Sequence, residues 1–113
     1  MPEMRVEWAD AARDDLRAIV FYIAQDSIAN ALAVVESLER CAATLCDLPT
    51  RGRVVPELRR LGERRFREVF ESPWRIVYLV EAERVLVVAV VDGRRDLQDW
   101  LKEHEARIRR ANS

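Results

Sequence analysis

The stretch that decides the fold is residues 66–95, FREVFESPWRIVYLVEAERVLVVAVVDGRR. Within it, residues 74–80 and 85–91 are apolar runs rich in β-branched side chains, separated by the short polar segment 81–84. Runs of this length and composition, bounded by turn or charged residues, are typical of strands. The stretch therefore predicts a β-hairpin, and the seven consecutive apolar residues of its second strand predict burial on both faces.

A charged residue, Arg75, interrupts the first strand of this predicted hairpin. A guanidinium on a mostly buried strand needs a carboxylate partner or an opening to solvent. Arg94 and Arg95 are expected near the same end of the hairpin, and Arg64, Arg65 and Arg67 are expected along the adjoining strand. Such a cluster suits recognition of phosphate or carboxylate groups. Alternatively the role of Arg75 is purely structural, and its candidate partners are Glu68, Glu71 and Asp92.

Two helices are predicted upstream of the hairpin. Residues 4–8 alternate apolar and charged, as in a short edge strand, and the apolar period then becomes helical from Asp10, the expected N-cap, to about Gln25. Ser27 is the expected N-cap of a second helix, which Pro49 stops because proline has no N–H. The connection between the two helices is so short that we expect an antiparallel helical hairpin.

The remaining segments complete an α+β pattern. Residues 49–53 are turn-rich, residues 54–63 have no clear period, and residues 64–71 resume strand character. The apolar spacing of the last part of the chain predicts a C-terminal helix over about residues 96–110. The predicted order is β-α-α-β-β-β-α, a small antiparallel sheet backed by an N-terminal helical hairpin, in a single domain over residues 1–113.

Charge is distributed unevenly along the chain, although the net charge is only −1. Residues 1–50 carry four arginines against nine acidic residues, whereas residues 51–75 carry eight arginines against four glutamates. A nearly neutral chain has no general affinity for nucleic acid. The basic middle is therefore either a solvated surface or a binding surface for phosphates or an acidic partner.

Several kinds of chemistry are not expected. No uncharged run approaches the ~20 residues of a membrane span, and no signal or transit peptide is expected at the N-terminus. Cys41 and Cys46 point to different sides of a predicted helix and cannot pair, which indicates a reducing, cytoplasmic location. With three glycines and one histidine, no nucleotide loop, metal site or cofactor is predicted. His104 shares a helical stripe with apolar residues and is interpreted as a packing residue.

Four short motifs occur in order along the chain. They are A-x-x-D-L-x-x-I-x-x-Y-I at residues 12–23, L-x-x-x-P-x-x-G-R at residues 45–53, W-R-I-V-Y at residues 74–78 and D-G-R-R-D-L at residues 92–97. In this order and spacing they resemble the RelE/ParE superfamily of bacterial toxins from type II toxin–antitoxin systems. The resemblance implies an antiparallel sheet with an N-terminal helical hairpin, in agreement with the fold predicted from the residues.

Two activities occur in families that this chain resembles. RelE-like members cleave mRNA in the ribosome, and the resemblance places their arginines at Arg75 and Arg95. Their C-terminal acid–base residue, commonly a tyrosine, corresponds here to Trp100 or Leu101, which leaves His104 as the candidate. General acid–base help is worth typically ~10²–10⁴-fold in rate. The absence of a tyrosine at this position favours a resemblance to ParE-like members. These inhibit DNA gyrase, are not enzymes, and cause growth arrest and plasmid stabilisation.

The resemblance also implies partners. A cognate antitoxin is expected to wrap the toxin with an acidic, amphipathic segment that folds as it binds, and operator DNA is reached only through that antitoxin. DNA gyrase is the expected target, the ribosome and mRNA are the alternative, and a non-toxic, antitoxin-binding co-repressor is a third hypothesis. The residues expected to bind partners are Arg65, Arg67, Arg75, Arg94, Arg95 and Trp100.

Overall fold

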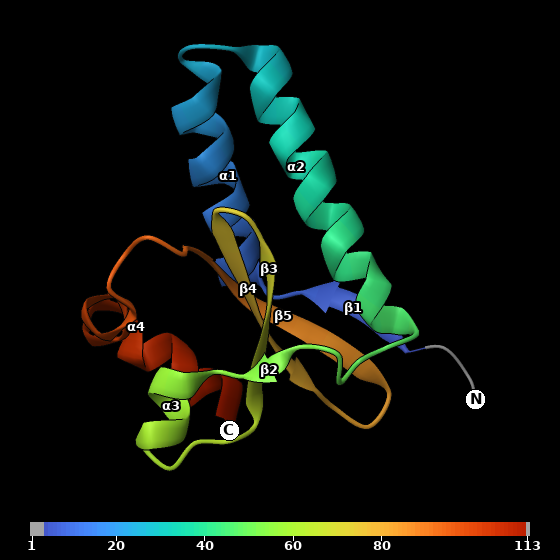
Figure 1. Ribbon diagram of the computed structural model, residues 1–113, viewed down its shortest axis with the longest axis vertical. Helices are drawn as coiled ribbons and strands as arrows, with labels where there is room; N and C mark the ends of the chain where they lie inside the picture. The colour runs from blue at the N-terminus through green and yellow to red at the C-terminus, as the bar shows by residue number, and fades with distance from the viewer. Residues whose placement is uncertain (1–3, 113) are drawn as a thin grey trace.

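The computed structural model describes residues 4–112 as a sheet with helices on both faces (Figure 1). In chain order, its elements are β1 (Arg5–Trp8), α1 (Asp10–Ala24), α2 (Ile28–Ala43), the 3-10 turn η1 (Thr44–Cys46), β2 (Arg53–Val54), α3 (Pro56–Arg60), β3 (Phe66–Glu71), β4 (Trp74–Val80), β5 (Arg84–Asp92) and α4 (Leu97–Asn112).

Within residues 4–112, the strands form one five-stranded sheet in the order β1-β5-β4-β3-β2. Neighbouring strands are antiparallel except β1, which runs parallel to β5 with Val6 opposite Val85. The predicted α+β class and the predicted hairpin of β4 and β5 are confirmed. Figure 1 shows α1 and α2 as an antiparallel pair that extends well beyond the sheet.

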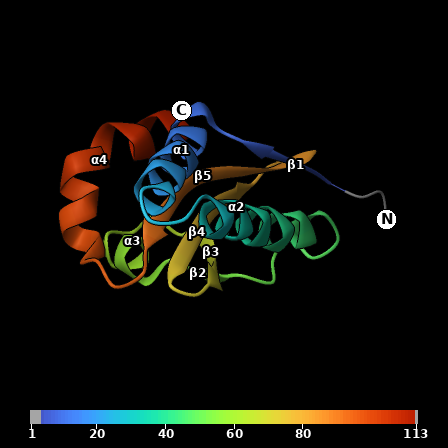
Figure 2. The same cartoon turned by 90° about the horizontal axis from the view of Figure 1, so that it is seen from above.

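The two faces of the sheet carry separate apolar cores. On one face, α1 and α2 pack over side chains that include Ile76 and Tyr78 of β4. On the other face, α3 and α4 pack over side chains that include Val77 and Leu79 of the same strand. Alternate residues of β4 therefore serve opposite cores, as the period of a strand requires. Figure 2 shows the first part of α4 set apart from α1 and α2, and its C-terminal end beside α1.

A register shift lies within the apolar run of β5. Val77 lies opposite Ala89, but Tyr78 lies opposite Val87, so Val88 is an extra residue in β5. Such a bulge interrupts the alternation of side chains. Val87 packs beneath the α1–α2 hairpin, whereas Val88 and Ala89 both belong to the core beneath α3 and α4. The predicted burial of this strand on both faces is confirmed.

A local signal fixes the N-terminus of α2 but not that of α1. The Ser27 hydroxyl accepts a hydrogen bond from the Asn30 N–H at 3.1 Å, so Ser27 caps α2 as predicted. The prediction for α1 was wrong, because its N-cap is Ala9 and Asp10 lies within the first turn. In that position the carboxylate favours the positive end of the helix dipole instead of capping it.

The segment without a clear period contains two short elements that the sequence did not predict. β2 pairs Arg53 with Glu68 and adds an edge strand to the sheet. α3 begins with Pro56, at a position where the missing N–H costs no helical hydrogen bond. Gly62, with φ 87°, follows the end of α3 in the left-handed region that favours glycine. β3 then begins at Phe66, two residues later than predicted.

Leu38→Ala is expected to lower the free energy of unfolding by ~2–5 kcal/mol, because Leu38 is fully buried between α2 and the sheet. Leu16→Ala is expected to cost less, since Leu16 is only partly buried. Leu32→Ala is the matched control on the same helix, where the side chain is 58% exposed. Urea unfolding followed by circular dichroism measures all three. Equal losses at Leu32 and Leu38 would show that the buried face of α2 is assigned wrongly.

Candidate functional site

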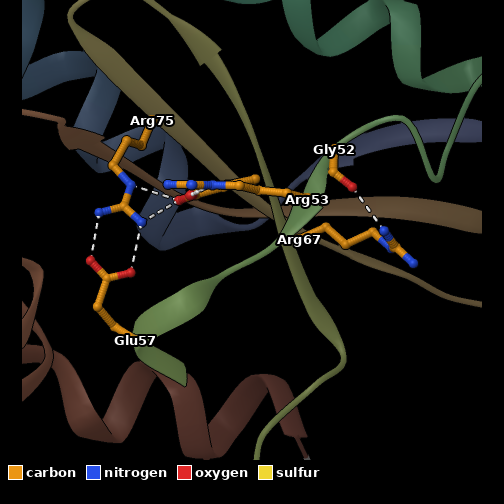
Figure 3. Close-up of polar contacts among 6 residues, drawn as sticks. Gly52, Arg53, Glu57, Arg67 and Arg75 are labelled. Carbon is orange, nitrogen blue, oxygen red and sulfur yellow. Dashed lines mark hydrogen bonds and ion pairs between the residues drawn. The ribbon is translucent and has the colours of Figure 1, made fainter. Parts of the chain in front are cut away.

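A chain of four charged side chains joins β2, β3, β4 and α3 (Figure 3). The Arg75 Nε, on β4, donates to Glu68 Oε1, on β3, at 2.6 Å. The two terminal nitrogens of the same guanidinium donate to the two carboxylate oxygens of Glu57, on α3, at 2.9 and 3.0 Å. Arg53 Nε, on β2, donates to Glu68 Oε2 at 2.7 Å. We call these four residues the ionic network; both oxygens of its central carboxylate are engaged.

The centre of the ionic network is buried, and its rim is exposed to solvent. Glu68 is 1% exposed and Arg75 is 6% exposed, whereas the Arg53 side chain is 55% exposed. Burial by itself lowers the pKa of Arg75, but the hydrogen bonds to Glu57 and Glu68 outweigh that effect and raise the pKa above its ordinary value. The bond from Arg75 holds the pKa of Glu57 below its ordinary value. Arg75 and Glu57 are therefore both charged at neutral pH.

The turn that precedes β2 fits closely against the sheet. The Gly52 N–H donates to the Tyr78 hydroxyl at 3.0 Å. Arg67 donates to the Gly52 carbonyl at 2.8 Å (Figure 3). A Cβ atom at residue 52 would lie 2.4 Å from the Glu68 carbonyl oxygen, a distance that only glycine avoids. The glycine of the second motif thus allows the close approach that brings Arg53 to Glu68.

A second polar cluster holds α4 against α1 and β5. The Asp15 carboxylate, on α1, accepts hydrogen bonds from the Val90 N–H at 2.9 Å and from Arg107, on α4, at 2.8 Å. The backbone of β5 is open at this point because β1 pairs with it only as far as Val87. The Arg107 guanidinium also lies over the Trp100 ring, 5.2 Å from its centroid. The aspartate of the first motif therefore links three elements, which its sequence spacing did not reveal.

The arginines expected at one end of the sheet have different partners. Arg75 contacts Glu68, which is one of its three candidate partners from the sequence. It also contacts Glu57, which the sequence did not indicate. Arg94 pairs with Asp92 at 2.8 Å, so this aspartate, another of the three candidate partners of Arg75, serves a different arginine. The three arginines Arg75, Arg94 and Arg95 thus do not share a carboxylate among the described residues.

The other residues expected to bind partners lie in varied surroundings. The exposed Arg65 bonds to Glu63 in the loop before β3. Arg67 is held by the Gly52 carbonyl. Trp100 is 5% exposed and belongs to the core beneath α4, so it presents little surface to a partner. The exposed members of the set, whose side chains a partner can reach directly, are Arg65, Arg94 and Arg95.

The three residues of the alternative nuclease site are engaged in separate interactions. Arg75 belongs to the ionic network, and Arg95 pairs with Glu103 at 2.6 Å. The His104 Nδ1 lies 2.8 Å from the Trp100 carbonyl oxygen, and the two rings stack with centroids 4.4 Å apart. Because a carbonyl oxygen only accepts, Nδ1 is the donor in this hydrogen bond. The backbone at His104 is not helical, at φ −123° and ψ 21°, and kinks α4.

Searches of the described part of the chain for a metal-ligand cluster and for a membrane-spanning helix find neither. Over residues 4–112, no group of three histidine, cysteine or acidic side chains is placed to hold a metal ion. No helix in the same range combines the length and the apolar character that crossing a membrane requires. Cys41 and Cys46 are unpaired with each other, and burial raises the pKa of the Cys41 thiol, which favours its unreactive protonated form.

Comparison of the sequence with protein families finds one match. Residues 6–97 match the family described as the ParE toxin of the type II toxin–antitoxin system parDE. No curated protein has a significantly similar sequence. The matched region includes all four of the motifs described above and extends from β1 to the first residue of α4.

Two solved toxin–antitoxin structures contain a similar chain. The chromosomal ParDE system from P. aeruginosa matches with a TM-score of 0.67 and 19% sequence identity, covering 80% of this chain and 96% of the other. The RelBE2 complex from Mycobacterium tuberculosis matches with a TM-score of 0.55 and 23% identity, covering 81% and 93%. At these identities the likeness is one of fold.

Arg75→Met is expected to lower the free energy of unfolding by ~3–5 kcal/mol, because it leaves the buried Glu68 carboxylate without its closest cation. A second change, Glu68→Leu, is expected to recover part of this loss by removing the stranded charge. Arg94→Met, at an exposed ion pair, is the control and should unfold as the wild type does. Chemical denaturation measures all four proteins. Wild-type stability in Arg75→Met would contradict the structural importance of the ionic network.

Glu57→Gln is expected to make stability less sensitive to acid. The folded-state pKa of Glu57 lies below its ordinary value of 4.5, so its ionised form stabilises the folded state. That contribution is complete above the ordinary value and disappears as the pH falls through the lowered folded-state pKa. Thermal unfolding of wild type and variant at a series of pH values from about 7 down to about 3 should show the two curves drawing together as the pH falls. Parallel curves would contradict the pairing of Glu57 with Arg75.

Proposed function

The chain belongs to the ParE toxin family of type II toxin–antitoxin systems, and from this membership we propose that it arrests growth by binding and poisoning DNA gyrase, without catalysing a reaction. A cognate antitoxin is the proposed partner that neutralises it, and operator DNA is reached only through that antitoxin. The proposed place of action is the cytoplasm, where gyrase acts.

The main support for the gyrase proposal is that every guanidinium nitrogen of Arg75 is hydrogen-bonded to a carboxylate. A nuclease that cleaves RNA needs a guanidinium free to stabilise charge that develops on a phosphate in the transition state. Here the three guanidinium nitrogens all contact Glu57 or Glu68 at 2.6–3.0 Å, and the residue is 6% exposed. A phosphate would have to displace two carboxylates to reach it. This favours a role for Arg75 in the fold over one in RNA cleavage.

The surroundings of His104 support the same proposal. An RNA-cleaving site also needs a group that accepts or donates a proton within hydrogen-bond reach of the substrate. The His104 ring is stacked on Trp100, and its Nδ1 proton is held by the Trp100 carbonyl. The imidazole is thus engaged in packing and in a hydrogen bond to the backbone. Recognition of a protein target therefore fits the described side chains better than catalysis does.

Antitoxin binding is proposed on the charge of the exposed arginines and on the two fold relatives. Both matched structures are toxin–antitoxin systems. Arg65, Arg94 and Arg95 are exposed, and their ion pairs with neighbouring carboxylates are of the kind that contribute little stability. An acidic partner could exchange with these carboxylates at low cost. Arg67 is the less exposed, fourth member of this proposed contact set.

Expression of the chain without its antitoxin is expected to stop growth through DNA damage. The measured signs are induction of the SOS response and gyrase-dependent DNA breaks, both suppressed when the antitoxin is co-expressed. The reason is that a poison of gyrase leaves broken DNA, whereas a ribosome-dependent nuclease leaves truncated mRNA. Cleavage of mRNA within translating ribosomes, with gyrase fully active, would replace this proposal by the nuclease alternative.

His104→Ala is the control that separates the two activities. A nuclease that depends on this residue would lose the ~10²–10⁴-fold rate contributed by general acid–base catalysis and would no longer arrest growth. A gyrase poison should retain growth arrest in a His104→Ala protein whose folding is verified by circular dichroism. A folded His104→Ala protein that is harmless would count against the gyrase proposal. Growth without arrest by the wild type would instead favour the co-repressor hypothesis.

A further inference from the structure

The hairpin formed by α1 and α2 carries large apolar side chains that are exposed to solvent. Phe21, near the end of α1, is 74% exposed, and Ile28 and Leu32, on α2, are 70% and 58% exposed. An open groove of about 530 Å³ runs between the two helices and is lined by side chains of both. Figure 1 shows that the end of the hairpin with the connecting loop stands clear of the sheet. Apolar surface gathered in this way is typical of protein interaction sites.

The exposed side chains and the groove belong to a single face of the hairpin. On α1 this face consists of Arg13, Leu16, Val20, Phe21 and Ala24, which are spaced i, i+3, i+7, i+8 and i+11. On α2 it consists of Ile28, Leu32, Val35 and Glu39, which are spaced i, i+4, i+7 and i+11. We call these nine residues the hairpin face. Helices of 15 and 16 residues give it a length of roughly 22–24 Å.

The two ends of the hairpin face differ in character. The end at the connecting loop is apolar, and the opposite end is charged, with Arg13 on α1 and Glu39 on α2. Neither of these two side chains forms a hydrogen bond or an ion pair with another residue in the range 4–112. Arg13 lowers the pKa of Glu7 only as a more distant charge. One unpaired charge of each sign is therefore available, and the two signs lie on different helices.

We infer that the hairpin face binds a second copy of this chain, in a parallel two-fold dimer. A two-fold axis along the hairpin places α1 of each copy against α2 of the other and forms a four-helix bundle. The apolar ends then meet, and Arg13 of each copy pairs with Glu39 of the partner subunit. An antiparallel arrangement would instead set each charged end against Ile28 and Leu32 and leave the charges without partners.

The charge pattern selects a second copy over other occupants. It is complementary to itself, because a two-fold axis exchanges the helix that carries Arg13 with the helix that carries Glu39. An acidic peptide or a phosphate backbone would pair with Arg13 but would be repelled by Glu39. The contact of α4 with α1, between Arg107 and Asp15, lies on another side of α1 and leaves the hairpin face open.

Sedimentation equilibrium of the purified full chain, over a range of concentrations, measures dimerisation. The wild type is expected to approach twice the mass of one chain as its concentration rises. Phe21→Glu and Leu32→Glu are each expected to weaken dimerisation by about tenfold or more. Leu61→Glu, at a leucine beside α3 that is 75% exposed, is the matched control and should dimerise as the wild type does. Circular dichroism verifies the folding of each variant.

Two charge reversals test the pairing across the two-fold axis. Arg13→Glu brings two carboxylates together in each contact and Glu39→Arg brings two guanidiniums together, so each variant alone is expected to dimerise about tenfold more weakly. An equimolar mixture of the two variants is expected to dimerise again. In the mixed dimer the introduced carboxylate meets the introduced guanidinium, and the native Arg13 meets the native Glu39. Mixing could not restore a pair that forms within one chain.

The remaining outcomes overturn the inference. A wild type that stays monomeric at every concentration overturns it, and so does dimerisation that survives both Phe21→Glu and Leu32→Glu. Equal weakening by Leu61→Glu shows that the dimer does not depend on the hairpin face. Weakening by the charge reversals that mixing does not restore overturns the parallel arrangement. If the wild type is monomeric and Phe21→Glu loses the antitoxin in calorimetric titration, the hairpin face belongs to the antitoxin instead.

Discussion

The carboxylate of Glu68 is a buried charge in the middle of β3, and its need for partners organises much of the molecule. It is bound by Arg53 from one neighbouring strand and by Arg75 from the other, and Arg75 continues to Glu57 on α3. A buried charge without a partner is strongly destabilising. β2, β4 and α3 must therefore be in place together, although β2 and α3 are too short to be stable by themselves.

The same network encloses Arg75, whereas other cationic side chains of the fold remain open to a ligand. Guanidiniums suit both phosphate and carboxylate recognition, so the chemistry of this fold depends on which of them a ligand can reach. Arg75 is enclosed by two carboxylates, whereas Arg60 and Lys102 face an open apolar groove between α3 and α4. Charge directed outward beside an apolar surface is available to a ligand, whereas charge held inward joins α3 to the sheet.

Local patterns predicted the long elements well. The β-branched runs of β4 and β5, the apolar stripes of α1 and α2 and the cap at Ser27 depend on neighbouring residues, so they are visible in a window of ten to twenty positions. β2 and α3 escaped prediction because the spacing of the apolar residues in 54–63 fixes neither a helical nor a strand period. Two residues become a strand only because β3 offers a partner edge, and such pairing leaves no periodic trace.

The sequence by itself determined the α+β class, the order of the long elements, the resemblance to a toxin family and the choice of Glu68 as a candidate partner for Arg75. Only the tertiary structure decided that β1 runs parallel to β5, that Glu57 completes the ionic network, and that Arg107 reaches Asp15. The physical reason is distance along the chain. A hydrophobic period reports which side chains leave water, but residues 18 and 92 positions apart meet only where the packed elements bring them together.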